Sequence, residues 1–331
     1  MPQSEGADGL RVGTRGSKLA LTQTQTVVAQ LTAAHAGLAV ATETVRTIGD
    51  KIQDVAMSKI GDKGLFTKEL EAALAAGAVD AVVHSLKDMP TQLPAGMQLA
   101  AVTRREDPRD AVVMAARTRA RRLEDLPAGS TVGTGSVRRV AQLRRQFPHL
   151  RFADIRGNID TRLAKLDAGD SPFDALVLAA AGLRRLGLEA RITCTLDETL
   201  YAVGQGALGI EARAGDARTA ALVRCLDHRP TRLECLAERE LMRVLEGGCS
   251  VPIGVLSAWA PGRLSLRAIV ASPDGARAVE AEHSAALSPT EGDPDEADAC
   301  ARALGARVAA TMRERGVDDI LAAIKRPDLP I

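Results

Sequence analysis

Residues 78–90, AVDAVVHSLKDMP, join a short apolar run to a polar turn that could do chemistry. The run 79–83 is β-branched, which predicts a strand buried on both faces in an α/β sheet. The polar side chains that follow it are His84, Ser85, Lys87 and Asp88. Because ligands of open α/β sheets bind outside the carboxyl ends of strands, the lysine and aspartate are placed to meet a small molecule. A solvated turn is the alternative interpretation.

Arginines follow several strand ends in the middle of the chain. Short strands are predicted at 131–134, 152–155 and 175–180, and each leads towards a glycine. The arginines just beyond these strands are Arg138, Arg139, Arg156, Arg162 and Arg185. A single arginine on a helix usually lies on a solvated face, but several at one sheet edge favour bidentate recognition of carboxylates or phosphates.

Arg15 and Ser17 lie between a predicted strand, 10–14, and the long helix that follows it. The free amides of a helix N-terminus attract anions, so these two residues could bind an anionic group. A plain N-cap role for Ser17 is the alternative.

Cys249 lies in the string GGCSVPIG, after a helix predicted over 233–245. The two glycines before it leave the sulfur uncrowded, as a covalent attachment point requires. A buried structural cysteine is the alternative interpretation.

The elements that must position these residues alternate between strands and helices, which predicts an α/β fold. Further strands are expected at 40–47, 99–103 and 110–116, and helices at 65–76, 137–146 and 216–226. The charged segment 103–110 and the glycine-rich segment 200–211 are the expected crossovers between two lobes. Residues 48–63 have little periodicity, which indicates a mobile loop from which Lys59 and Lys63 could reach over a cleft.

The last hundred residues predict a separate small α+β domain. Thr231 and Glu234 form an expected capping box for the helix over 233–245. An antiparallel meander over 251–260, 264–272 and 278–286 follows, and a helix over 297–315 is expected to cover it.

Composition excludes several classes of function. The chain has 331 residues, with 43 Lys and Arg against 42 Asp and Glu, so no global field favours nucleic acid or an anionic membrane. Aromatic residues make up 2%, which leaves little to stack bases. The five cysteines lack CxxC spacing, which argues against a metal site and for reduced thiols in the cytoplasm. No apolar run approaches membrane-spanning length, and no targeting segment is evident.

Eight strings together resemble the porphobilinogen deaminase family, also called hydroxymethylbilane synthases. In chain order they are GTRGSKLALTQT, KGLFTKELE, VVHSLKDMP, GTGSVRR, RGNIDTRL, AGLRRLG, VGQGALGIE and GGCSVPIG. The resemblance implies an α/β fold of three domains: two lobes like those of type 2 periplasmic binding proteins, and a small C-terminal α+β domain with a three-stranded antiparallel sheet. The implied domains are residues 1–104 with 206–228, residues 105–205, and residues 229–331. Lys18 and Gly13 depart from residues common in the family, but neither touches an implied catalytic group.

The resemblance also implies an activity and a cofactor. Such enzymes join four porphobilinogen molecules head to tail with loss of ammonia, on a dipyrromethane cofactor held by a cysteine thioether, and water then releases hydroxymethylbilane. By motif match, Cys249 is the attachment site and Asp88 the catalytic carboxylate. The implied cofactor-binding residues are Lys87, Ser85, Thr134, Ser136, Arg138, Arg139, Arg156, Gly157, Arg162 and Arg185. The implied substrate-binding residues are Arg15, Ser17, Lys59, Lys63, Phe66, Arg156, Arg162 and Arg185.

This chemistry suits the residues. Loss of ammonia leaves a pyrrole cation that a fixed, ionised Asp88 carboxylate would stabilise. The growing chain carries an acetate and a propionate on every ring, which explains clustered arginines in a protein without net basic charge. The expected protein is a cytoplasmic monomer of haem biosynthesis that uses no metal, nucleic acid or membrane.

Two other classes of function stay open from the residues alone. A two-lobed solute-binding protein could close its arginines on a dicarboxylate, although it leaves Cys249 without a role. A Schiff-base enzyme could use Lys87 as its nucleophile, although the neighbouring Asp88 would keep that amine charged.

Overall fold

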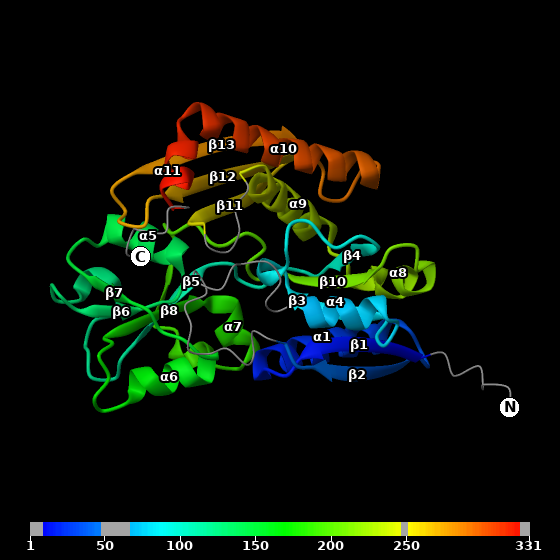
Figure 1. Cartoon of the computed structure of the whole chain (residues 1–331), viewed down its shortest axis with the longest axis horizontal. Coiled ribbons are helices and arrows are strands. Elements are labelled where there is room, and N and C mark those ends of the chain that lie inside the picture. Colours follow the sequence, from blue (N-terminus) through cyan, green and yellow to red (C-terminus); the bar gives the residue numbers. More distant parts are fainter. Residues whose placement is uncertain (1–8, 48–66, 246–250, 325–331) are drawn as a thin grey trace, which may run out of the picture. The chain divides into compact units, whose positions relative to one another are not determined.

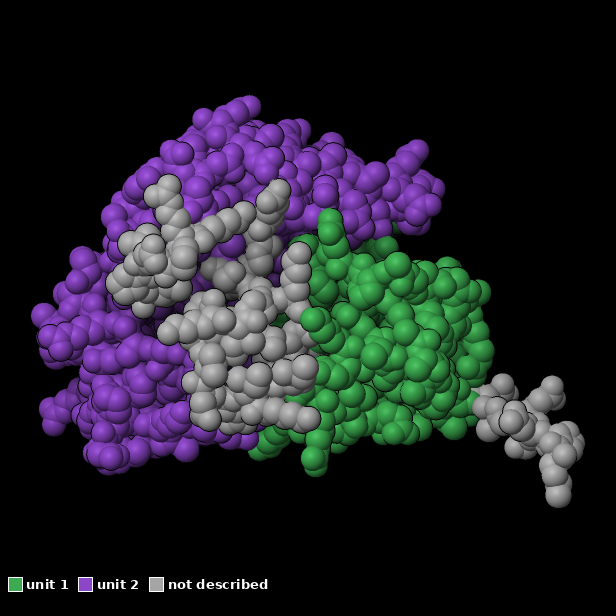
Figure 2. All heavy atoms as spheres, viewed as in Figure 1, with its two compact units in different colours: residues 1–52, 63–105, 207–232 green, residues 53–62, 106–206, 233–331 purple. Residues whose placement is uncertain are grey.

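The computed structural model describes residues 9–47, 67–245 and 251–324. The chain forms two compact units, shown in different colours in Figure 2. The first consists of residues 1–52, 63–105 and 207–232, and the second of residues 53–62, 106–206 and 233–331. Each unit is built around at least one β-sheet (Figure 1).

The first unit is an α/β lobe with a five-stranded mixed sheet in the order β2-β1-β3-β10-β4. Its strands are β1 (Gly9–Arg15), β2 (Ala39–Val45), β3 (Ala81–Ser85), β4 (Met97–Val102) and β10 (Leu208–Arg213). Strands β1, β2 and β3 run parallel, whereas β10 is antiparallel to both of its neighbours. The helices are α1 (Lys18–Ala34), α4 (Lys68–Ala75) and α8 (Ala217–Val223), with a 3-10 turn at Arg224–Leu226.

Strand β3 is buried because helices cover both faces of this sheet. Val83 packs in one apolar cluster with Val27 and Leu31 of α1, whereas Val82 packs in another with Leu70 and Leu74 of α4. Successive side chains of a strand point to opposite faces, so an unbroken apolar run is what a strand between two helix layers requires.

The second unit repeats this design in a sheet of order β7-β6-β8-β5-β9. Its strands are β5 (Asp110–Met114), β6 (Thr131–Gly133), β7 (Arg151–Ala153), β8 (Ala175–Ala179) and β9 (Cys194–Leu196). The helices are α5 (Val137–Gln146), α6 (Ile159–Asp167) and α7 (Ala180–Arg185), and 3-10 turns lie at Leu123–Asp125 and Glu189–Arg191. In each lobe the fourth strand of the sheet, β10 or β5, is antiparallel to its neighbours. It is also the first strand after the chain passes from one lobe to the other.

The rest of the second unit is a small α+β domain. Its antiparallel sheet consists of β11 (Ile253–Ala260), β12 (Arg263–Ala271) and β13 (Ala278–Ala286). The helices are α9 (Arg229–Val244), which begins within the last residues of the first unit, α10 (Pro294–Glu314) and α11 (Val317–Ile324). One continuous apolar core joins the sheet to these helices. The α/β fold class with two similar lobes and a three-stranded C-terminal sheet is therefore confirmed, while the exact domain boundaries stay a prediction.

Helices α9 and α10 meet at Gly305. A Cβ added there would collide with the carbonyl oxygen of Ala237 and come within 3.0 Å of Leu241 N. We expect Gly305→Ala to lower the free energy of unfolding by roughly 1–3 kcal/mol, because the overpacking outweighs the better helix propensity of alanine. Chemical denaturation checks this. The control is Gly169→Ala, which adds its methyl group where no atom lies within 4 Å; equal stability of the two variants would contradict close packing.

Several element boundaries differ from the sequence prediction. Helix α5 and strand β13 match it, but β3 begins at Ala81 and continues to Ser85, because β10 pairs with it over that span. The capping box was wrong: α9 begins at Arg229, and the ring of His228 instead bonds the Thr231 hydroxyl at 2.9 Å. Strand β9 and helix α11 were not predicted.

Candidate active site

A 3-10 turn, Leu86–Asp88, directly follows β3 and carries Lys87 and Asp88. Leu86 is buried and anchors the turn, and its backbone N–H donates to the Ala207 carbonyl at 3.0 Å. Met89 is also buried, whereas Lys87 and Asp88 are half-buried. Two apolar anchors thus hold a short turn whose polar side chains keep access to solvent.

The residues predicted at the end of β1 lie at the same edge of this sheet. Strands β1 and β3 are parallel, so their carboxyl ends face the same way and bring Arg15 near the level of His84. Ser17 is the N-cap of α1, where its hydroxyl accepts the Ala20 N–H at 3.3 Å. The capping interpretation of Ser17 is therefore correct, and a contact to an anion would be an additional role.

Ser85 has a partner that the sequence did not suggest. Its hydroxyl and the Gln23 amide lie 3.0 Å apart, and Gln23 is 4% exposed. A buried glutamine on the covered face of α1 was the available signal, because polar residues there need a hydrogen-bond partner.

In the second lobe, the N-terminus of α5 gathers four of the predicted residues. Ser136 is the N-cap, and its hydroxyl accepts the Arg139 N–H at 3.5 Å. Thr134 is 2% exposed, and its hydroxyl accepts the Ser136 N–H at 3.4 Å. Side-chain oxygens thus satisfy backbone donors that a helix start would otherwise leave free.

Arg138 and Arg139 turn inward to Asp110, the first residue of β5. Arg138 Nη1 lies 2.7 Å from Asp110 Oδ2, and Arg139 Nη2 lies 2.8 Å from Oδ1. A third residue, Gln205, donates to the same carboxylate through Nε2 at 2.9 Å. The carboxylate is fully buried, which opposes its ionisation, but the two guanidiniums outweigh burial and hold the pKa of Asp110 far below its usual range. Asp110 and Gln205 were missed, although an acid that opens an apolar strand signals a buried partner.

Each of these arginines has one buried nitrogen that makes no hydrogen bond among the described residues. Among the described residues, Arg138 Nε and Arg139 Nε are buried without a hydrogen-bond partner. Buried donors without partners are rare in native proteins, so these two atoms are an unusual feature of the start of α5.

Arg156 and Arg162 complete a cationic cluster with Arg139. Burial lowers the pKa of Arg162, and repulsion from Arg139 and Arg156 lowers it further, whereas Asp154 opposes the shift. Arg162 Nε donates to the Gly157 carbonyl at 2.7 Å, and Arg156 Nε lies 2.6 Å from Asp154 Oδ2. A bound anion would offset the repulsion that Arg139 and Arg156 exert on Arg162.

Gly157 has a structural reason to lack a side chain. Its φ is +110°, and an added Cβ would lie 2.8 Å from Thr161 Cγ2. Any substitution would therefore strain the turn that presents Arg156 and Arg162.

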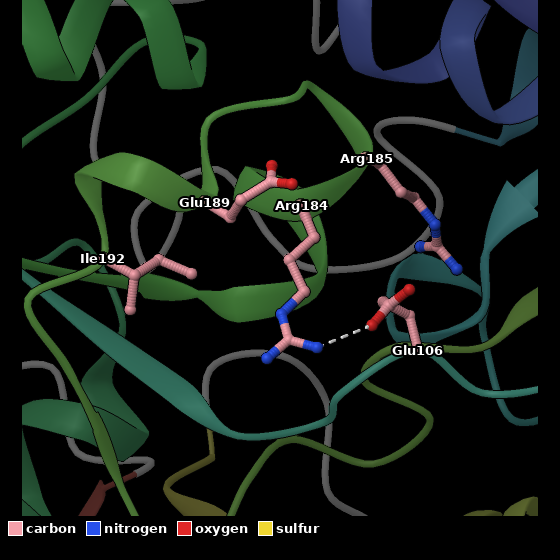
Figure 3. A pocket seen from close by; sticks show the side chains of 5 residues that line it. All are labelled: Glu106, Arg184, Arg185, Glu189 and Ile192. Carbon is pink, nitrogen blue, oxygen red and sulfur yellow. Dashed lines mark hydrogen bonds and ion pairs between the residues drawn. The ribbon is translucent and has the colours of Figure 1, made fainter.

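Arg185 lines a hollow of about 590 Å³ (Figure 3). The hollow is lined by Glu106, Arg184, Arg185, Glu189 and Ile192. In Figure 3 the Glu106 carboxylate lies between the two guanidiniums, and Arg184 Nη1 reaches it at 3.3 Å. Arg185 Nη2 donates to the Gly206 carbonyl at 2.7 Å. Burial lowers the pKa of Arg185, and the Glu106 charge opposes this.

Four predicted site residues, Cys249, Lys59, Lys63 and Phe66, lie outside the described residues. The other predicted residues divide between the two units: Arg15, Ser17, Ser85, Lys87 and Asp88 are in the first, and the remaining set is in the second. Within the described ranges, no helix has the length and apolar character needed to cross a membrane.

Two lobes of the same strand order, with a polar turn after β3 in one and arginines after strand ends in the other, define a class: a two-lobed α/β protein with a candidate site for an anion. Comparison with known proteins makes this specific. The family model described as "Porphobilinogen deaminase, dipyromethane cofactor binding domain" matches residues 10–221, and "Porphobilinogen deaminase, C-terminal domain" matches residues 232–314. The chain belongs to the porphobilinogen deaminase family.

Relatives match along nearly the whole length. The porphobilinogen deaminase of Synechococcus sp. (strain RCC307) is 51% identical over 320 residues, which are 96% of this chain and 97% of the relative. That of Synechococcus elongatus is 51% identical over 323 residues, which are 97% of each chain. That of a Nostoc species is 49% identical over 317 residues, which are 95% of this chain and 94% of the relative.

Proposed function

We propose that this protein is a hydroxymethylbilane synthase, a transferase of tetrapyrrole and haem biosynthesis. It joins four porphobilinogen molecules head to tail with loss of ammonia, and hydrolysis releases hydroxymethylbilane. The observation that carries the proposal is the group of arginines beyond the strand ends of the second lobe, where the charges of Arg139 and Arg156 act on the buried Arg162, in the part of the chain that the cofactor-binding model matches. Carboxylate side chains of pyrroles are anions of the kind that such a group of arginines binds.

The residues of the second lobe fit a dipyrromethane. Its acetate and propionate groups would accept from the unpartnered Nε atoms of Arg138 and Arg139 and from Arg156 and Arg162. The group supplies, when bound, the free pyrrole carbon at which the chain is extended. These arginines hold its acidic arms and fix the position of its rings.

Asp88 is the proposed catalytic carboxylate. Its turn follows a buried strand and is anchored by Leu86 and Met89, so the backbone that carries the carboxylate is held in place. A fixed negative charge beside a pyrrole N–H stabilises the cation formed when ammonia leaves, and the same oxygen can take up or return a proton. Arg15, Ser17, Lys87 and Ser85 share its sheet edge and would bind the substrate's carboxylates or the cofactor.

Cys249 is the proposed attachment site of the cofactor. Intact mass spectrometry of the denatured protein tests this together with the function. Active wild-type protein should exceed the mass of its sequence by two condensed porphobilinogen units, and Cys249→Ser should lose both this excess and the consumption of porphobilinogen.

The matched control is Cys225→Ser, which removes an exposed free thiol and should keep the mass excess. A mass equal to the bare sequence in active wild-type protein would refute covalent attachment. A Cys249→Ser protein that retains the excess would place the thioether elsewhere.

We further propose that the enzyme acts as a monomer in the cytoplasm. Among the described cysteines, Cys194, Cys225 and Cys300 are free thiols, which fits a reducing compartment.

A further inference from the structure

A buried pair of titratable side chains joins β3, the strand before the Asp88 turn, to its neighbour β10. His84 Nε2 is 2.9 Å from Glu211 Oε2, and the two side chains are 3% and 0% exposed. His84 is the last residue but one of β3, and Glu211 belongs to the antiparallel neighbour β10. Neither side chain takes part in the proposed contacts to substrate or cofactor.

The Asp88 turn rests on the same strand, β10. The Leu86 N–H donates at 3.0 Å to the carbonyl of Ala207, the residue directly before β10. Gly209, which pairs with His84 in the sheet, has no side chain; an added Cβ would lie 2.7 Å from Met89 Sδ and 2.9 Å from Leu86 Cδ1. The turn therefore folds onto β10 where that strand leaves room, and its orientation depends on how β10 is held against β3.

Glu71 of α4 is the third member of this cluster. Burial raises the pKa of Glu71, and the charge of Glu211 raises it further, whereas the Thr67 hydroxyl, His84 and Lys68 oppose the shift. Among the described residues, one carboxyl oxygen of Glu71 and one of Glu211 are buried without a hydrogen-bond partner. Among the described residues, the side-chain hydrogen bond to the Glu211 carboxylate comes from His84. The pair is thus the polar link between the two strands on the α4 face.

We propose that His84 and Glu211 are positioning residues for the reaction: they lock β3 to β10 and so fix the Asp88 carboxylate relative to the reacting pyrrole. This role rests on the proposed function. A carboxylate displaced by about 1 Å loses much of its effect on a transition state while substrate binding persists. Loss of the pair should therefore reduce kcat more than it changes KM.

Steady-state kinetics of cofactor-loaded enzyme with porphobilinogen tests the role. His84→Leu removes the hydrogen bond to Glu211 and should lower kcat by about ten- to a hundredfold with KM within about twofold of wild type. His84→Gln keeps an amide donor and should recover most of that loss. Glu211→Ala breaks the same hydrogen bond from the other side and should show the same loss of kcat. It takes the place of His84→Leu in the test if that variant does not fold.

The matched control is Val82→Ala, on the same strand and the same face as His84. It leaves a cavity in the core and should lower Tm without lowering kcat of the folded enzyme. Wild-type kcat in a folded His84→Leu or Glu211→Ala variant, or an equal kcat loss in Val82→Ala, would overturn the positioning role. Wild-type protein that consumes no porphobilinogen would instead refute the proposed function, and with it this role.

Discussion

Replacing Asp88 with asparagine should lower the turnover of porphobilinogen by at least about a hundredfold. The amide keeps the shape of the carboxylate but carries no charge to stabilise a pyrrole cation and no proton-accepting oxygen of comparable basicity. Because the turn is held by the buried Leu86 and Met89, the fold should be unchanged. Single-turnover kinetics of cofactor-loaded protein, with stability followed by thermal unfolding, measures both effects.

The control for this substitution is Glu43→Gln, which neutralises an exposed carboxylate on β2 of the same lobe. It should leave turnover unchanged. Porphobilinogen should still bind to the Asp88→Asn protein with near-normal affinity, since its acidic arms are held by cations. Near-normal turnover in Asp88→Asn would remove this carboxylate from the mechanism.

Replacing Asp110 with asparagine should lower the free energy of unfolding by about 3–5 kcal/mol. Among the described residues, Asp110 is the only acidic side chain that forms an ion pair with the buried guanidiniums of Arg138 and Arg139. The substitution removes its charge. An uncompensated buried charge is far more costly than a lost surface ion pair. Chemical denaturation at pH 7 gives the difference directly.

The control is Asp197→Asn, which breaks an exposed ion pair with Arg109 in the same lobe and should cost less than about 1 kcal/mol. The pKa of Asp110 is lowered in the folded state, so its stabilising contribution is present above the unfolded pKa and is lost only as the pH falls through the folded value. The difference between wild type and Asp110→Asn should therefore stay constant from about pH 8 to pH 5. A difference that shrinks within that range would show that Asp110 is not the low-pKa group.

Local patterns predicted the elements well where one segment determines its own conformation. Helix α5 was predicted to the residue, because Ser136 caps it and apolar side chains recur at helical spacing. The polar turn after β3 was also predicted, because the apolar run of the strand stops at His84 and polar residues follow it. The family resemblance rested on such short strings and is confirmed by the matches along the chain.

Contacts between distant segments could not be predicted in this way. The ligand-binding role predicted for Arg138 stays a prediction, but its hydrogen bonds to Asp110, 28 residues earlier, and to the Leu200 carbonyl, 62 residues later, were not predicted. The N-terminus of α9 was misplaced because His228, rather than Thr231, lies at its start. No local pattern indicates that β10 inserts between β3 and β4, since that pairing joins segments more than a hundred residues apart.

The insertion of β10 between β3 and β4 has a consequence for biosynthesis. When the ribosome has translated β4, which ends at Val102, the amino-terminal sheet still lacks the strand that separates β3 from β4. That strand ends at Arg213, so at a translation rate of about 5–20 residues per second the nascent chain exposes two unpaired edges for roughly 5–20 s. Unpaired edges are templates for aggregation, and the emerging polypeptide should therefore bind chaperones most strongly in this interval.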